Sequence, residues 1–173
     1  MKKTLVLLMF LISGNQLIFS QKKIWDETKE EKKERMQWWT DARFGMFIHW
    51  GLYAQPARHE WVKSAEKMTN EDYQKYFDVF NPDLYNPHDW AKQAKKAGMK
   101  YAVITAKHHE GFNLFDSKFT DYKSTNTPYG KDILREWVEA FRSEGLKIGF
   151  YYHGHFKQLE YSPALFGLIM NWV

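Results

Sequence analysis

The sequence contains no cysteine. This excludes disulfides, thiolate metal sites, a cysteine nucleophile and lipid-modified cysteine. A strong excess of one charge is also lacking. The 25 basic and 21 acidic residues give +4, and without Lys2 and Lys3 of the N-terminal segment the balance falls to +2 (23 − 21). Nucleic-acid-binding domains carry a much larger basic excess, so we expect no nucleic-acid partner.

Apolar runs long enough to cross a bilayer are lacking as well. Residues 1–20 combine Lys2 and Lys3 with the apolar stretch from Leu5 to Ile12 and end on the small Ser20. This is the pattern of a secretory signal peptide, and it is too short for a stable membrane span. We expect cleavage after Ser20, export to the periplasm or outside the cell, and no membrane attachment afterwards.

Several catalytic motifs are missing. No GxGxxG follows a strand and no phosphate-binding P-loop is present, which argues against a nucleotide-binding doubly wound sheet. There is no GxSxG elbow for Ser-His-Asp catalysis and no HExxH zinc motif.

Apolar spacing and turn residues predict an alternation of strands and helices. Asn86 followed by Pro87 is typical of a helix start, and Gly98 and Gly145 are placed to end helices. We also expect Asn70 to cap a short helix. The predicted helices are 26–41, 70–77, 86–97 and 132–144, and the predicted strands are 44–49, 101–106 and 146–152.

The connections between these elements predict the fold class. The turns from helix to strand are tight, whereas the loops after the strands at 50–85 and 107–130 are long. Such alternation is typical of parallel α/β structure, in which loops after the strands form the functional face. We therefore predict an α/β fold with a parallel sheet.

Titratable and aromatic side chains follow each predicted strand. Imidazoles and carboxylates bind sugar hydroxyls as donors and acceptors, and an indole can lie against the C–H face of a sugar ring. If the strands are parallel neighbours, these groups converge on one mouth. The candidate groups are His49 after the first strand, Glu60 and Trp61 in the loop that follows, His108 and His109 after the second strand, and Tyr151, Tyr152 and His153 at the end of the third.

Other interpretations of these residues remain open. His49 and Tyr151 could be packing residues, and Glu60 an ordinary exposed acid. A zinc site is the chemical competitor, because histidines grouped with a carboxylate bind metal. We expect four of the histidines to be surface or loop residues, namely His59, His88, His153 and His155.

Together these residues resemble the α-L-fucosidases of glycoside hydrolase family twenty-nine, from about Trp38 to Tyr152. The resemblance implies a (β/α)8 barrel with a C-terminal β-sandwich, retaining cleavage of terminal α-L-fucose from fucosylated glycans, and no cofactor or metal. By this resemblance, the residues that line the fucose subsite would be His49, Glu60, Trp61, His108, His109 and Tyr151. The matching segments are Trp39 to Gly51, Glu60-Trp61, Phe80-Asn81-Pro82, Trp90, Ala97-Gly98, Lys107 to Phe112, Phe115-Asp116-Ser117 and Gly145 to Tyr152.

The sequence departs from the family pattern in two places and stops matching beyond Gly154. Glu110 stands where the family usually has aspartate, and His153 follows the paired tyrosines where serine is common. A retaining glycosidase needs two carboxyl groups about 5 Å apart. By the resemblance both come later in the chain, so we assign no such role to Glu60, Glu110 or Asp116.

We therefore expect residues 21–173 to be the N-terminal portion of a glycosidase barrel, an incomplete TIM-type (β/α)8 barrel with about its first three βα units. The nucleophile and acid/base are expected beyond Val173, so the chain alone is predicted to be inactive. A non-catalytic carbohydrate-binding fragment is the alternative. A histidine-metal hydrolase is a third possibility.

Overall fold

The computed structural model describes residues 27–153, and the predicted signal peptide and the segment after His153 lie outside them. The chain divides into two compact units with a boundary between Trp38 and Trp39, inside helix α1 (Lys29–Ala42). Thr28 and Glu31 start this helix with reciprocal bonds: each backbone N–H donates to the other's side chain, at 2.8 and 3.1 Å.

The second unit contains a parallel sheet in the order β1-β2-β3. Its strands are β1 (Gly45–Ile48), β2 (Tyr101–Lys107) and β3 (Lys147–Tyr152). Ile48 pairs with Ile104, which pairs with Phe150. The predicted parallel α/β arrangement is confirmed, and the strand boundaries agree to within two residues.

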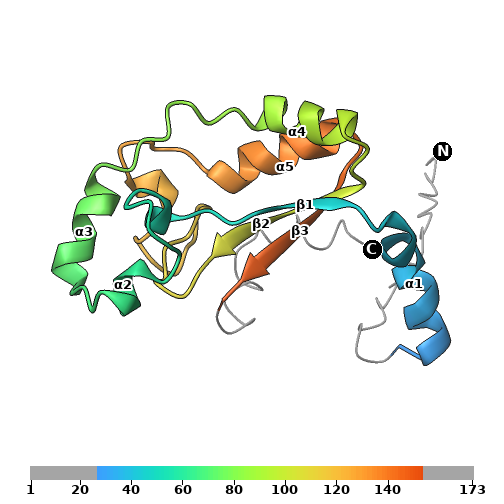
Figure 1. Ribbon diagram of the computed structural model, residues 1–173, viewed down its shortest axis with the longest axis horizontal. Coiled ribbons are helices and arrows are strands. Elements are labelled where there is room, and N and C mark those ends of the chain that lie inside the picture. The colour runs from blue at the N-terminus through green and yellow to red at the C-terminus, as the bar shows by residue number, and fades with distance from the viewer. Residues whose placement is uncertain (1–26, 154–173) are drawn as a thin grey trace, which may run out of the picture. The chain divides into compact units, whose positions relative to one another are not determined.

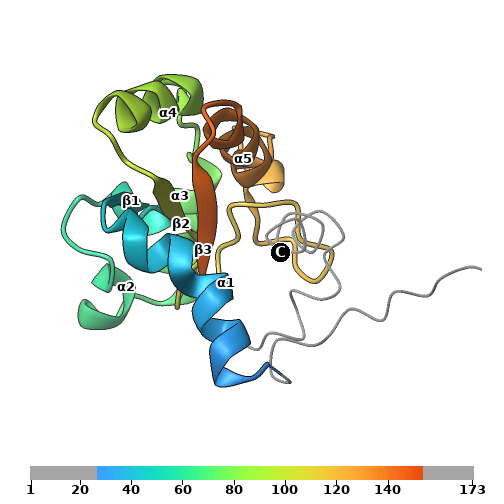
Figure 2. The ribbon, with the colours of Figure 1, turned by 90° about the vertical axis from the view of Figure 1, so that its right-hand side faces the viewer.

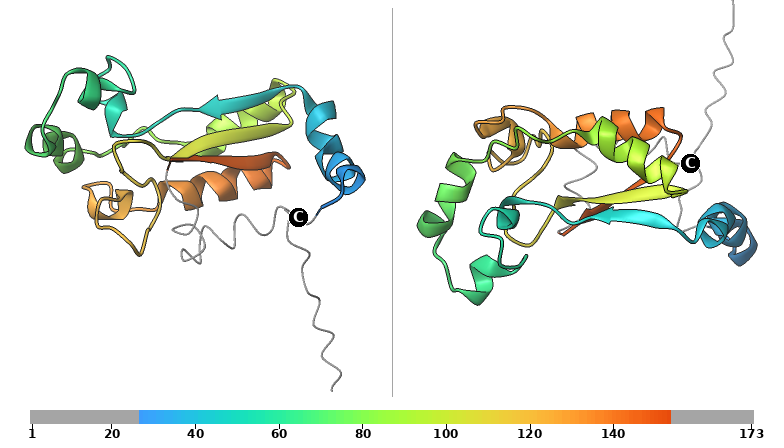
Figure 3. Two further views of the ribbon diagram at one scale, coloured as in Figure 1. Left: turned by 90° about the horizontal axis from the view of Figure 1, so that it is seen from below. Right: turned by 45° about the horizontal axis from the view of Figure 1, so that its top comes forward.

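Helices α4 (Pro87–Lys96) and α5 (Ile133–Ser143) lie side by side along one face of this sheet, as Figures 1 and 3 show. Figure 2 shows the same layering from the end of the strands. Trp137 is completely buried and stacks on Phe141 with ring centroids 4.6 Å apart. Apolar burial here is the main stabilising contribution. The core also includes Ala91, Ala94, Ala102, Ile104, Ile133, Leu134 and Ile148.

Capping residues define the helix ends largely as predicted. The Asn86 side chain accepts from the Asp89 N–H at 3.1 Å, and Gly98 follows α4 with φ of 87°. Asp132 accepts from the Arg135 N–H at 2.9 Å at the start of α5. These side chains satisfy backbone donors that a helix leaves unpaired.

The predicted cap of α3 (Asn70–Asp78) is wrong by one residue. Thr69 has extended backbone and its hydroxyl accepts from the Asp72 N–H at 3.0 Å, so Thr69 is the cap. Asn70 is already helical, and its side-chain oxygen accepts from Lys63 Nζ at 2.8 Å. Sequence alone could not separate two adjacent residues that both favour the cap position.

The alternation of the strands puts another set of side chains on the opposite face of the sheet. Phe47 pairs in register with Val103 and Gly149, and Thr105 pairs with Tyr151. Phe47 is 54% exposed and Tyr151 is 38% exposed. This face is therefore much less covered than the helix-covered face.

The long loops contain three short elements that the sequence did not predict: η2 (Leu52–Ala54), α2 (Val62–Ala65) and η3 (Ser124–Asn126). Among the helices of residues 27–153, none combines the length and the apolar character that a bilayer crossing requires.

Candidate functional site

Side chains from the ends of all three strands meet at the carboxyl end of the sheet. The ring centroids of His49 and His108 are 4.7 Å apart. The ring centroid of Tyr151 lies 6.2 Å from that of His49 and 5.9 Å from that of His108. The predicted convergence is confirmed. It follows from the parallel register, because equivalent ends of neighbouring strands share one edge of the sheet.

His49 is held in place by Tyr53, a residue that the sequence did not single out. The Tyr53 hydroxyl lies 2.8 Å from His49 Nδ1 and 3.3 Å from Thr105 Oγ1. Thr105 in turn accepts from the Trp50 N–H at 2.7 Å and donates to the Trp50 carbonyl at 2.5 Å. Burial raises the pKa of Tyr53, so the phenol keeps its proton. The first strand end is thereby tied to the second.

Trp61 and His109 form a stacked pair at the rim. Their centroids are 3.8 Å apart and their planes differ by 9°. His109 Nε2 lies 3.1 Å from the backbone carbonyl of Glu60. The loop after β1 is therefore joined to the loop after β2 through this carbonyl, while the residue Glu60 is exposed. The expected binding of a hydroxyl by the Glu60 carboxylate stays a prediction.

A pocket of about 260 Å³ opens beside His49. Glu60 and Tyr53 also line it, together with Arg58 and His59, two residues that the sequence did not assign to the site. Arg58 forms an ion pair with Glu66, which fixes the guanidinium at the wall of the pocket. The pocket thus combines donors and acceptors with an aromatic wall, as carbohydrate sites require.

His108 and Glu110 are two enclosed titratable groups of the site that lie next to each other. Their side chains are 6% and 1% exposed, and Nδ1 lies 3.5 Å from Oε2. Burial lowers the pKa of His108 to about 4 and raises that of Glu110 to about 7. His108 is therefore neutral near pH 7, and the contact is not a salt bridge between two full charges. No local sequence pattern predicts the burial of Glu110.

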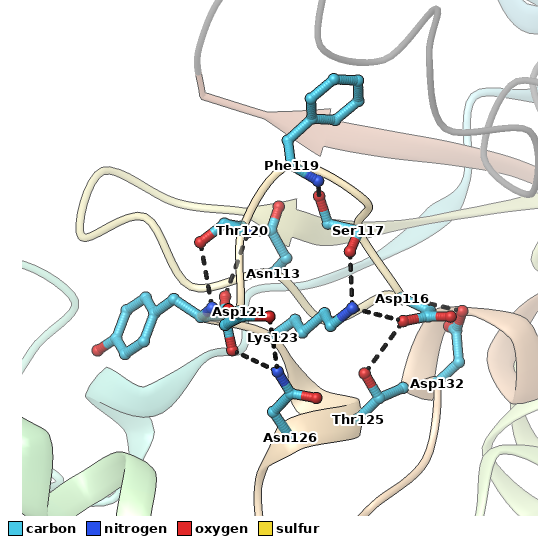
Figure 4. A network of polar contacts seen from close by, with 11 residues as sticks. Asn113, Asp116, Ser117, Phe119, Thr120, Asp121, Lys123, Thr125, Asn126 and Asp132 are labelled. Carbon is cyan, nitrogen blue, oxygen red and sulfur yellow. Dashed lines mark hydrogen bonds and ion pairs between the residues drawn. The ribbon is translucent and has the colours of Figure 1, made fainter.

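Asp116 belongs to a network of polar contacts that connects two parts of the chain, as Figure 4 shows. Lys123 Nζ donates to Asp116 Oδ1 at 2.9 Å and to the Ser117 carbonyl at 2.8 Å. The Asp116 N–H donates to Asp132 Oδ2 at 3.1 Å, and Thr125 donates to its carboxylate at 3.2 Å. Lys123 lowers the pKa of Asp116. These contacts fasten the loop after β2 to the start of α5.

One group of side chains has the spacing of metal ligands. Potential ligand atoms of His108, His109 and Glu110 lie within 4.8 Å of one another. The ring centroids of the two adjacent histidines are 4.6 Å apart. The contacts of His109 with Trp61 and Glu60 account for its position without an ion. His153-Gly154-His155 also has a spacing found among metal ligands; His153 is exposed, and residue 155 lies outside the described range.

The chain is similar to known proteins over most of its length. The family model described as alpha-L-fucosidase matches residues 12–167, a longer stretch than the expected match from about Trp38 to Tyr152. The alpha-L-fucosidase of Dictyostelium discoideum is 30% identical over 173 aligned positions, which cover 86% of this chain and 37% of the relative. We conclude that the chain belongs to the alpha-L-fucosidase family.

Solved structures agree with this family membership. Alpha-L-fucosidase isoenzyme 1 from Paenibacillus thiaminolyticus is 54% identical with a TM-score of 0.69, and the match covers 78% of this chain and 35% of that one. A fucosidase from Bacteroides thetaiotaomicron, trapped as a covalent intermediate with 2-fluoro-fucosyl fluoride, is 45% identical with a TM-score of 0.66, covering 69% and 30%. The chain thus spans about a third of the length of these relatives.

Proposed function

We propose that this chain forms the N-terminal part of the catalytic domain of an exported, retaining α-L-fucosidase that removes terminal α-L-fucose from glycans. The observation that carries the proposal is the convergence of His49, His108 and Tyr151 from three parallel strand ends. Family membership supports the reaction class. The covalent intermediate trapped in the Bacteroides relative supports retention of configuration.

In this proposal the six predicted residues form the fucose subsite. His49 and His108 offer ring nitrogens to the sugar hydroxyls, and Glu60 offers its exposed carboxylate from the pocket wall. Trp61 is 47% exposed and Tyr151 is 38% exposed, so both present apolar surface to the C–H face of a sugar ring. His109 keeps the indole in place by stacking on it.

The two catalytic carboxyl groups are proposed to come from parts of the whole enzyme outside residues 1–173. Asp116 is engaged by Lys123 and Thr125. Glu110 is enclosed against His108, away from solvent. Glu60 lies in the pocket wall as a lone exposed carboxylate. A retaining mechanism needs a nucleophile and an acid/base about 5 Å apart, and these three environments do not supply such a pair.

The sheet is proposed to be the first three βα units of a (β/α)8 barrel. The parallel order β1-β2-β3 and the two helices on one face are consistent with this. Phe47 and Tyr151, on the other face, would then point into the barrel interior, where further strands would cover them. Export is proposed from residues 1–20, with the mature protein in the periplasm or outside the cell.

Calorimetric titration of the 173-residue chain with L-fucose tests the subsite, with L-rhamnose as the control sugar. Saturable binding of L-fucose, lost in Trp61→Ala and kept in the exposed control Trp39→Ala, supports the proposal. Equal heats for both sugars, or binding unaffected by Trp61→Ala, would contradict it.

Hydrolysis of an aryl α-L-fucoside tests the position of the carboxylates. We expect no turnover by the chain alone and normal turnover by the whole enzyme. Firm fucose binding by the chain, together with a whole protein that shows no turnover, would favour a non-catalytic carbohydrate-binding module. Turnover by the chain alone would mean that a catalytic pair lies within residues 1–173.

A further inference from the structure

A buried carboxyl group faces a buried imidazole nitrogen under the floor of the site. The Glu110 side chain is 1% exposed, and Oε2 lies 3.5 Å from His108 Nδ1. Both carboxyl oxygens and this nitrogen are enclosed and form no hydrogen bond within the described part of the chain. Enclosed polar atoms of this kind are costly unless they pair. In this geometry the Glu110 carboxyl group and His108 Nδ1 are placed to form a hydrogen bond with each other.

The space for this carboxyl group depends on a glycine. A Cβ atom at Gly51 would lie 2.6 Å from the Tyr53 ring and 3.2 Å from Glu110 Oε1. Gly51 therefore lets the loop after β1 close over Glu110. The separation of 3.5 Å is longer than an ordinary hydrogen bond, and such bonds in sites without ligand often shorten when substrate binds.

Among residues 27–153, no cation forms a hydrogen bond with the Glu110 carboxylate. Lys63 Nζ donates to Asn70 at 2.8 Å and lies over the Tyr73 ring. Lys107 Nζ lies 5.2 Å from the centre of the Tyr152 ring. Burial therefore dominates, which agrees with the raised pKa of Glu110, about 7. The groups that act on Glu110 and His108 electrostatically are His49, Tyr53, Glu60, Lys63, Tyr73, Lys107, His109, Tyr122 and His153.

We infer that Glu110 is a positioning residue that decides which ring nitrogen of His108 carries the proton, and thereby whether Nε2 donates or accepts a hydrogen bond in the sugar site. This inference rests on the proposed function for the identity of the ligand. Nδ1 is the enclosed nitrogen, so Nε2 is the ring nitrogen that remains for a hydrogen bond to a sugar hydroxyl.

The proton balance has two states. With an ionised carboxyl group, Nδ1–H donates to the carboxylate and Nε2 is an acceptor. With a protonated carboxyl group, its O–H donates to Nδ1 and the imidazole proton is on Nε2, which becomes a donor. The pair gains one proton from solvent in this change, and the imidazole is neutral in both states.

Long-range nitrogen–proton NMR correlation on the labelled 173-residue chain tests the inference without any sugar. In buffer with EDTA, we expect the His108 proton on Nε2 at pH 5.5 and on Nδ1 at pH 8.5, with a midpoint near the Glu110 pKa of about 7. Glu110→Gln should abolish the change, and Glu110→Asp should keep a change with a shifted midpoint. Glu139→Gln, on an exposed carboxyl group of α5, is the matched control and should leave it unaltered.

A His108 tautomer that is constant with pH, or a change that persists in folded Glu110→Gln, would overturn the inference. Circular dichroism checks the fold, and if Glu110→Gln does not fold, the wild-type and Glu110→Asp profiles decide. A second measurement is the L-fucose Kd at both pH values. We expect a difference of about fivefold in the wild type, from the changed hydrogen bond, and none in Glu110→Gln. Failure to bind L-fucose at either pH would sink the proposed function, while the NMR result alone decides the role of Glu110.

Discussion

The helix-covered face of the sheet and the mouth at the carboxyl end of its strands bury different kinds of side chain. The helix-covered face buries apolar side chains such as Trp137 and Phe141, and its enclosed polar atom without a partner, Trp137 Nε1, is a neutral N–H. The mouth at the carboxyl end of the strands instead encloses an imidazole and a carboxyl group. Burial of ionisable groups lowers stability. The difference indicates that the first region maintains the fold, whereas the second gives up stability for chemistry.

The largest expected effect tests the stabilising region. Trp137→Ala removes a completely buried indole and leaves a cavity, which costs about 3–5 kcal/mol of unfolding free energy. Trp61→Ala at the mouth removes a ring that is 47% exposed, and we expect a loss of about 1 kcal/mol. Urea denaturation of both variants measures the contrast. Equal losses would show that the mouth is packed as tightly as the core.

The next largest effect is a pH dependence of stability that arises from Glu110 and His108 at the mouth. The pKa of Glu110 is raised from 4.5 to about 7 in the folded chain, so its contribution to stability is complete below pH 4.5 and is lost as pH rises through 7. The loss is up to about 3 kcal/mol. His108, whose pKa falls from 6.5 to about 4, has the opposite slope: its contribution is complete above pH 6.5 and is lost toward pH 4.

The difference between Glu110→Gln and the wild type isolates the carboxyl contribution. The stability of the variant relative to the wild type should rise between pH 4.5 and pH 8 by up to about 3 kcal/mol. Denaturation at both pH values measures it, and Glu139→Gln on the exposed side of α5 should show no such trend. A constant difference would mean that Glu110 is not held in a desolvated site.

A smaller effect concerns the lid over this carboxyl group. Gly51→Ala puts a methyl group 2.6 Å from the Tyr53 ring, and overpacking of this kind costs about 1–3 kcal/mol. It should also weaken fucose binding, because Tyr53 positions His49. Gly149→Ala is the matched control, since its methyl group would lie 3.3 Å from a Val103 methyl. Denaturation measures the stability of both variants, and titration measures their fucose binding. Equal losses in the two variants would show that Gly51 has no special role over Glu110.

The smallest expected effect concerns the loop after β2. Lys123→Met breaks the contacts with Asp116 and Ser117, and we expect a loss of about 1 kcal/mol, because the ion pair is partly exposed. Lys118→Met changes an exposed lysine of the same loop and should be nearly neutral. Hydrogen exchange of the backbone N–H of Asp116 should become faster only in Lys123→Met. Unchanged exchange would show that the loop does not depend on this lysine.

Local sequence patterns predict much of the fold and part of the candidate site. The alternation of strands and helices, the Asn86 cap, the glycines after α4 and α5, and the meeting of His49 with His108 all follow from periodicity, turn chemistry and the geometry of parallel sheets. The choice of Thr69 over Asn70 as a cap did not follow, because both side chains suit that position.

The sequence by itself determined which elements form and that polar groups gather at one end of the strands. Only the tertiary structure decided that Tyr53 holds His49, that Glu60 reaches His109 through its backbone carbonyl, and that Glu110 is buried against His108. Glu60 and His109 lie 49 positions apart in the sequence. Tyr53 and His49, like Glu110 and His108, are close in sequence, but their burial and their contact depend on how the loops fold over the strand ends, which no local pattern encodes.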